Sequence, residues 1–198
     1  MKKQIAAKIA FHPGVYPIFA GSGLVQSVAK RELLLHSAIA GIGIVLLLSI
    51  IFGNPRNLVL VLVNMPFALI GGVFAVFATG GSLSLGSLVG FVTLFGITTR
   101  NSIMMISHFE HLVKEEGMTW GLEAAIRGAS ERLLPILMTA LVTALGLLPL
   151  AIGAGEAGRE IEGPMAIVIL GGLLTSTVLN LVVLPTLALR YGRFDSKP

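Results

Sequence analysis

A single arginine stands in the middle of a long apolar stretch and is the residue best placed to do chemistry. Arg100 is the only charged side chain between Arg56 and Glu110, and the segment around it is long enough to cross a bilayer. A guanidinium at that depth costs at least ~2.5–3.5 kcal/mol on insertion scales. We therefore expect Arg100 to face protein and to find a carboxylate, yet no Asp or Glu lies in the interior of any apolar span.

The chemistry open to Arg100 is that of a fixed positive charge, because a guanidinium does not release its proton in a protein. Its carboxylate partner would take and lose the proton. The alternative is a structural or snorkelling arginine, although its position in mid-span makes snorkelling hard. Asn101 and Thr98 could satisfy polar groups beside Arg100, or they could simply join neighbouring helices. Since the carboxylate is missing, we interpret the chain as part of a larger assembly.

The evidence for a functional role is weaker for the other polar and sulfur-containing side chains. Thr139 and Thr143 lie four residues apart on one helix face, so they could face Arg100 or could bond to their own backbone. His108 and His111 have a spacing that suits a metal, but without further ligands we expect them to be solvated at a helix end. Methionine thioethers could ligate a soft metal ion, although methionine in an apolar helix usually serves packing. The residues concerned are Met104, Met105, Met138 and Met165. We expect a solvated loop around Glu156, Glu160 and Glu162, and a buried polar stripe at Thr177 and Asn180.

The composition identifies an integral membrane protein. The chain has 198 residues, of which 55% are hydrophobic and 12% charged, and its mean hydropathy is +0.91, whereas a soluble domain carries about 25% charged residues. The absence of cysteine excludes disulfides and thiolate metal sites. A net charge of +4 does not imply nucleic acid. No nucleophile–base pair or ligand set is recognisable, so we expect neither an enzyme nor a cofactor.

The pattern predicts an all-α, five-helix transmembrane bundle with a short non-membrane N-terminal segment. Tight turns and prolines divide the apolar sequence into spans at about 33–52, 57–79, 84–112, 133–153 and 164–190. We expect the third to be the longest and to project into the cytoplasm, and residues 114–132 to form an amphipathic connection. Val15–Ala20 reads as a short edge strand.

The positive-inside rule orients the bundle. One side carries seven of the 14 Lys and Arg residues, namely Arg56, Lys114, Arg127, Arg132, Arg190, Arg193 and Lys197. The opposite loops carry Arg159 and an excess of glutamate, which predicts a cytoplasmic C-terminus. The basic N-terminal residues then lie outside, which conflicts with the rule unless this segment follows an already translocated domain.

Several ordered motifs resemble those of the resistance-nodulation-division (RND) efflux transporters, above all the heavy-metal efflux branch. They cover about residues 13–193 and comprise Pro66–Gly72, Gly90–Ile97, Pro135–Thr139, Gly171–Gly172 and Leu184–Pro185. The resemblance is to the last five of the family's twelve transmembrane helices. It implies a remnant of the periplasmic porter loop at 1–32, a transmembrane domain at 33–190 and a cytoplasmic tail at 191–198, in a bacterial inner membrane.

The resemblance also implies a proton relay. In the family a basic residue on the tenth helix pairs with acidic residues on the fourth, and Arg100 matches that basic position. Thr139 matches a threonine of the same relay, and Asn101 lies beside Arg100. The expected partners are membrane lipids, the N-terminal part of the pump, and a trimeric assembly with a periplasmic adaptor and an outer-membrane channel. Without the acidic helices we expect no transport by this chain, and hence a fragment or a split pump; a non-transporting structural or regulatory subunit is the alternative.

Overall fold

The computed structural model describes residues 22–52, 54–80 and 83–194. In this part of the chain five helical rods are long and apolar enough to cross a membrane, which confirms the predicted all-α membrane bundle. The predicted strand at 15–20 lies outside the described residues, and no strand occurs within them.

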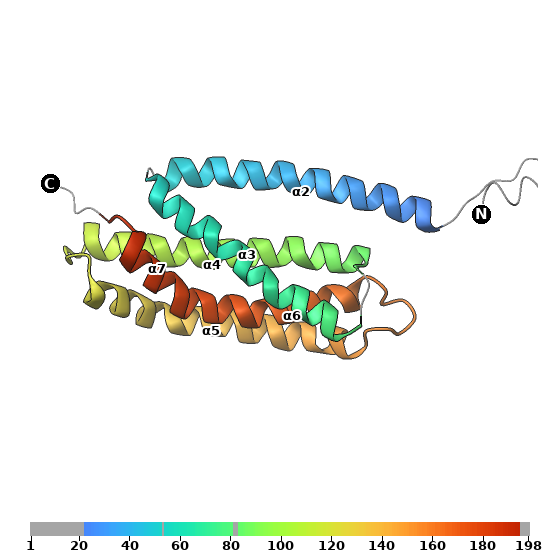
Figure 1. Cartoon of the computed structure of the whole chain (residues 1–198). Helices are drawn as coiled ribbons and strands as arrows, with labels where there is room; N and C mark the ends of the chain where they lie inside the picture. Colours follow the sequence, from blue (N-terminus) through green and yellow to red (C-terminus); the bar gives the residue numbers. More distant parts are fainter. Residues whose placement is uncertain (1–21, 53, 81–82, 195–198) are drawn as a thin grey trace, which may run out of the picture.

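The rods run up and down in chain order (Figure 1). They are α2 (Ser22–Phe52), α3 (Pro55–Ala78), α4 (Leu85–Lys114), α5 (Leu122–Ile152), and a last rod built from α6 (Glu162–Val178), the π-helical turn η1 (Leu179–Val183) and α7 (Leu184–Tyr191). The α2–α3 turn, the α4–α5 loop and the end of α7 share one end of the bundle, which we call the basic end. The α5–α6 loop lies at the opposite, acidic end.

Local sequence explains where the helices begin. Asn54 precedes α3 and its side chain accepts a hydrogen bond from the backbone N–H of Arg56, while Pro55 occupies the first helical position. Ser84 caps α4 by accepting from the N–H of Ser87 at 3.1 Å. Both caps satisfy donors that a helix start leaves without an intrahelical partner.

Three details of the predicted helices are wrong, and one of them is the start of the first helix, which lies at Ser22 instead of about 33. The fourth helix begins at Leu122 instead of 133, so the connection shrinks to residues 115–121. A hydropathy pattern detects the lipid-spanning part alone, whereas the polar first turns of α5 are also helical and carry the i,i+4 pair Arg127–Glu131. The third rod is also not the longest: α4 has 30 residues, and α2 and α5 have 31 each.

Small residues bring α3 and α6 together. A Cβ on Gly171 would meet the carbonyl oxygen of Gly71 at 2.7 Å, too close for any real side chain. A Cβ on Gly90 of α4 would lie 2.9 Å from the carbonyl oxygen of Met165 in α6. These glycines therefore let the helix backbones approach closely, and α6 becomes the helix against which α3 and α4 pack.

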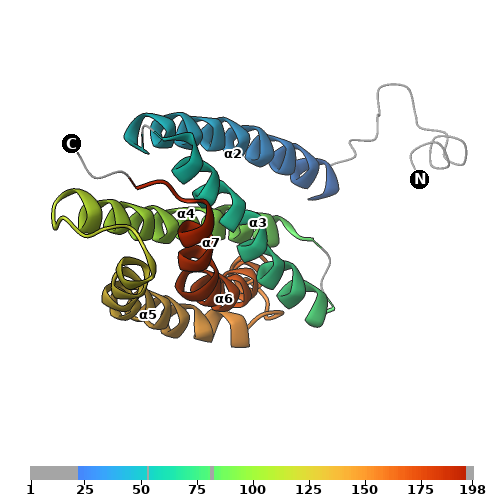
Figure 2. The ribbon, with the colours of Figure 1, turned by 60° about the vertical axis from the view of Figure 1, so that its left-hand side comes forward.

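The two outer helices are less covered than the inner three. In α2 and in α5, only 6% of the most apolar segment is buried. In α3, α4 and the last rod, 41–44% of the corresponding segment is buried. Both views place α2 along one side of the bundle and α5 along another (Figures 1 and 2). Their exposed apolar surfaces suit contact with lipid or with further helices.

We predict that Gly171→Val destabilises the bundle by ~1–3 kcal/mol, because the added side chain overpacks the crossing with α3. Gly146→Val on α5 is the matched control, since a Cβ there meets nothing within 4 Å. Thermal unfolding in detergent, followed by the fluorescence of Trp120, measures both variants. Equal loss of stability in the two variants would refute the close-packing role.

Candidate functional site

Three polar side chains from three rods meet inside the bundle. Asn64 of α3 donates through Nδ2 to Ser102 Oγ of α4 at 2.8 Å and to Asn180 Oδ1 of η1 at 3.0 Å. Ser102 Oγ in turn donates to Asn180 Oδ1 at 2.9 Å. Each of the three residues is at most 1% exposed. We call Asn64, Ser102 and Asn180 the polar cluster; it ties together the three best-buried rods.

The backbone of the last rod decides how the polar cluster is oriented. Asn180 Nδ2 donates to the carbonyl oxygen of Ser176 at 2.8 Å, which turns Asn180 Oδ1 toward its two partners. Asn64 must then present its amide nitrogen, because two facing oxygens would repel each other. Asn64 Oδ1 is consequently buried without a partner among the described residues. A buried acceptor of this kind commonly binds an ordered water.

The π-helical turn supplies the setting for Asn180. In η1 the N–H of Leu184 donates to the carbonyl of Leu179, five residues earlier. Pro185 follows and has no N–H to donate, so the regular hydrogen-bond pattern is interrupted beside it. Single π turns within α-helices frequently mark functional positions. Here the turn accompanies the fully buried Asn180.

Arg100 lies on a different face of α4. It is exposed, and no carboxylate, hydrogen bond or aromatic ring engages it among the described residues. The same face forms an open stripe, in which every residue is exposed: Thr93, Gly96, Arg100, Met104, Ser107 and His111. At 1.5 Å per residue, Arg100 is roughly 22 Å from either end of α4, so it sits at mid-membrane depth.

The other two predicted relay residues lie in different surroundings. Asn101 is buried at 6% exposure and makes no side-chain hydrogen bond within the described part of the chain. Thr139 of α5 is exposed and donates to the carbonyl oxygen of Pro135 at 2.9 Å, while Thr143 donates to that of Thr139 at 2.7 Å. Both threonines therefore bond to their own helix, and no hydrogen bond joins Thr139 to Arg100.

A charged network secures the basic end. His108 Nε2 lies 2.7 Å from Glu131 Oε2, and Arg127 pairs with both Glu131 and Glu116. The His108 side chain is only 11% exposed, which corrects the expectation that it is solvated, whereas His111 is exposed. These contacts join α4, the α4–α5 loop and α5.

The segment after α7 closes over the same end. Asn57 Nδ2 donates to Glu110 Oε1 at 2.9 Å and to the carbonyl oxygen of Arg193 at 3.2 Å. Phe194 is buried beside Phe109 and Trp120, with ring centroids 6.0 and 4.2 Å away. The start of α3 and the end of α4 are thus fastened to the last residues that the structure describes.

The acidic end is solvated, as the sequence predicted. Glu156, Glu160 and Glu162 are all exposed. Backbone N–H groups of Glu160 and Gly158 hold the pKa of the Glu160 carboxyl below its ordinary value, so this carboxyl stays ionised at neutral pH. The α5–α6 loop and the first turn of α6 therefore carry three acidic side chains and one basic side chain, Arg159.

No metal centre can be assembled from the described residues. They contain no group of three or more His, Cys, Asp or Glu side chains that could hold an ion. Of the four methionines considered, Met105 is buried in the core. Met104 and Met138 are exposed on different helices. For chemistry inside the membrane, the described residues offer the exposed cation of Arg100 and the buried, uncharged polar cluster.

Comparison with known proteins decides the family. Residues 1–190 match the model of the AcrB/AcrD/AcrF family. The chain belongs to this family. Its similarity to heavy-metal RND efflux proteins confirms the resemblance inferred from the motifs.

Two relatives and one solved structure illustrate the similarity. Protein HelA of Legionella pneumophila is 38% identical over 186 residues, which is 94% of this chain and 18% of HelA. The cobalt-zinc-cadmium resistance protein CzcA of Cupriavidus metallidurans is 38% identical over 92% of this chain and 17% of CzcA. A crystal structure of a heavy metal efflux pump superposes with a TM-score of 0.72 at 36% identity, covering 94% of this chain and 18% of the pump. The chain thus spans less than a fifth of the length of these family members.

Sequence reasoning missed two members of the polar cluster, Asn64 and Ser102. A signal for Asn64 was present, because it is the only amide side chain between Leu58 and Thr79. Ser102 carried no such signal, since serine in an apolar helix commonly bonds to its own backbone. The expectation that Asn180 is buried against a neighbouring helix is confirmed.

We predict that Asn64→Leu and Asn180→Leu are energetically coupled by about 0.5–1.5 kcal/mol in a double-mutant cycle of unfolding, because the two amides share one buried network. Asn57→Leu with Asn180→Leu is the control pair. Asn57 lies seven residues from Asn64 along α3 and bonds to Glu110 and Arg193 instead, so its effect should add to that of Asn180. Strict additivity in both pairs would show that the polar cluster does not fasten the rods.

Proposed function

We propose that this chain provides the basic side of the proton relay in a proton-driven RND pump that exports metal cations. The observation that carries the proposal is Arg100, an exposed guanidinium at mid-depth of a membrane-length helix, which pairs with no carboxylate of the described residues. Such a charge is costly in lipid, so it requires an acidic partner on helices that this sequence does not contain. The open stripe on α4 is the surface those helices would cover.

The chemistry follows from the fixed charge of Arg100. A nearby cation stabilises the ionised form of a carboxylate and lowers its pKa. Protonation of that carboxylate would release it from Arg100, and loss of the proton would restore the pair. Asn101 and Thr139 are proposed as polar members of the same relay. Thr139 would have to exchange its bond to the Pro135 carbonyl for one toward the relay.

The class of cargo is supported by the names of the relatives, which include resistance proteins for cobalt, zinc and cadmium and for nickel and cobalt. Because the described residues contain no cluster of metal ligands, we assign cargo binding to other parts of the pump. Transport then requires the acidic helices, a periplasmic porter domain, and a trimer with an adaptor and an outer-membrane channel. By itself the chain would export nothing.

A non-transporting subunit that occupies a pump is the second candidate, and it is supported by the same open surface.

The proposed location is a bacterial inner membrane with the basic end in the cytoplasm. Counted by Lys and Arg, the basic end carries Arg56, Lys114, Arg127, Arg132, Arg190 and Arg193, whereas the α5–α6 loop at the opposite end carries Arg159 alone. Residues 1–32 would then belong to the periplasmic loop, 33–190 to the membrane domain and 191–198 to the cytoplasmic tail. The Nζ of Lys30 donates to the Leu83 carbonyl at 3.1 Å in the α3–α4 turn, so the start of α2 lies at the acidic end, which is the periplasmic side in this orientation.

Cysteine labelling tests the orientation, and the chain has no cysteine of its own. A membrane-impermeant maleimide added to intact cells should label Ala157→Cys in the α5–α6 loop and leave Thr119→Cys in the α4–α5 loop unlabelled. Both positions are exposed. Labelling after permeabilisation controls for reactivity. Preferential labelling of Thr119→Cys from outside would reverse the proposed topology.

Substitution of Arg100 tests the relay, in a pump that supplies the remaining helices. Arg100→Lys should retain part of the proton-driven efflux because it keeps the charge and loses only the planar fork. Arg100→Met should abolish efflux with normal membrane insertion, since the partner carboxylate would hold its proton through the working pH range. Efflux and folded protein are measured together in proteoliposomes.

Two controls make the relay experiment decisive. Met104→Leu changes the open stripe one turn away without changing charge, and it should leave efflux near that of the unmodified pump. Proteoliposomes that contain only this chain should show no proton-coupled export. Normal efflux per folded molecule in Arg100→Met would end the relay proposal, and export by the chain alone would end the proposal that it needs further helices.

A further inference from the structure

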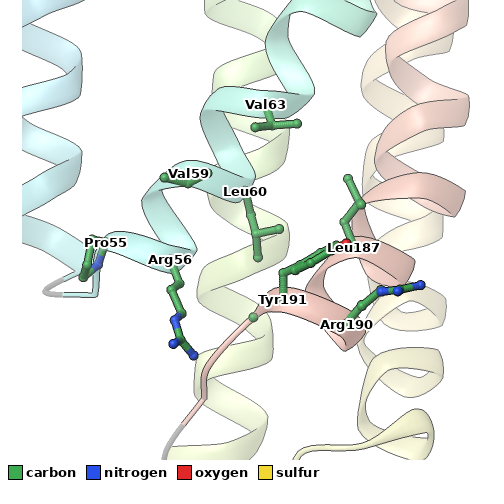
Figure 3. A pocket seen from close by; sticks show the side chains of 9 residues that line it. Pro55, Arg56, Val59, Leu60, Val63, Leu187, Arg190 and Tyr191 are labelled. Atoms are coloured by element: carbon green, nitrogen blue, oxygen red, sulfur yellow. The ribbon is translucent and has the colours of Figure 1, made fainter.

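An apolar groove opens on the outside of the bundle between α3 and α7. It has a volume of about 710 Å³ and its walls include Val59, Leu60 and Val63 from α3 and Leu187 from α7. Figure 3 shows these side chains on both sides of the opening. The volume is within the range of about 300–1,000 Å³ that is usual for small-ligand sites. Val59 and Val63 are 52% and 42% exposed, so the groove is accessible from the surrounding membrane.

Two arginines flank the groove at the basic end. Arg56 lies at the start of α3 and Arg190 in the last turn of α7, with Tyr191 between them (Figure 3). Both guanidiniums are exposed. The Arg190 guanidinium lies 5.7 Å from the centre of the Tyr191 ring, and this neutral ring attracts the cation without cancelling its charge. The groove therefore has a hydrophobic body and a positively charged mouth.

These two charges have no acidic partner among the described residues. Arg127 at the same end pairs with Glu116 and Glu131. The lack of an acidic partner is therefore not a general property of the arginines at this end of the bundle. Glu110 lines a neighbouring hollow that also includes Arg56. Its carboxylate, however, already accepts from Asn57 and lies 3.5 Å from Lys114. The field at the mouth of the groove is consequently positive.

We propose that this groove binds one anionic phospholipid from the leaflet at the basic end. Its phosphate lies between Arg56 and Arg190, and an acyl chain runs along Val59 and Val63. An amphiphile with a negative head and an apolar tail matches both parts of the site, because basic residues at the membrane surface attract anionic headgroups and the apolar walls bury hydrocarbon. A free cation is repelled by the same two charges. The lipid would bridge α3 and α7 from outside, independently of Arg100 and the relay.

The test uses the full chain purified in detergent and native mass spectrometry with added phosphatidylglycerol or phosphatidylethanolamine of identical acyl chains. The unmodified chain should retain one phosphatidylglycerol in preference to phosphatidylethanolamine. Each arginine should contribute about fivefold to the affinity. The double variant Arg56→Gln, Arg190→Gln should therefore bind phosphatidylglycerol about 25-fold more weakly. Arg56→Lys with Arg190→Lys should keep most of the preference, since the charge remains.

Matched variants separate this groove from general lipid contact. Val63→Trp fills the groove and should reduce binding of the retained lipid, whereas Val73→Trp on the same helix, 57% exposed and outside the groove, should not. Arg31→Gln removes an exposed arginine from α2 near the opposite end and should also have no effect. Circular dichroism confirms folding of each variant. Equal retention of the two lipids, or equal losses in Arg31→Gln and the double variant, would overturn the site, as would unchanged binding in Val63→Trp.

Discussion

The burial of Ser102 in the polar cluster is the constraint that sets the direction in which α4 presents Arg100. Arg100 and Ser102 are only two residues apart, yet Ser102 is fully buried and Arg100 is exposed. A helix turns by about 200° over two residues, because it has 3.6 residues per turn. When the polar cluster fixes Ser102 against α3 and η1, Arg100 must point out of the bundle. The cluster therefore sets the direction in which the charge is offered to a partner.

Close backbone contact makes that rotation possible. Gly71 and Gly171 let α3 and α6 approach until no side chain fits between them, and Gly90 does the same for α4 and α6. In a membrane, where lipid is as apolar as leucine, such packing and interhelical hydrogen bonds hold helices together. The inner three rods thus form one closely packed unit. The outer helices α2 and α5 add exposed apolar surface to it, which suits a structural unit inside a larger membrane assembly.

The two ends of the bundle have different chemistry. At the basic end, α3, α4 and the segment after α7 are joined through Asn57, Glu110 and Phe194, while Arg56 and Arg190 keep their charge available. At the acidic end the three glutamates are exposed, and backbone N–H groups hold the pKa of the Glu160 carboxyl below its ordinary value. A bundle with this asymmetry prefers one orientation in a bilayer with an anionic inner leaflet. The same asymmetry supports both the proposed topology and the lipid site.

The number of membrane helices, the family and the isolation of Arg100 were determined by the sequence alone, because long apolar runs, ordered motifs and a lone charge are local properties. The ends of the helices could be predicted less well from the sequence. Hydropathy does not detect the polar first turns of α5, which are helical from Leu122. The polar cluster was decided by the tertiary structure. Asn64, Ser102 and Asn180 are separated by 38 to 116 positions along the chain, and only the packing of α3, α4 and the π turn brings their hydrogen-bonding groups within reach. The groove between α3 and α7 has the same origin, because two segments more than a hundred residues apart in the sequence line it.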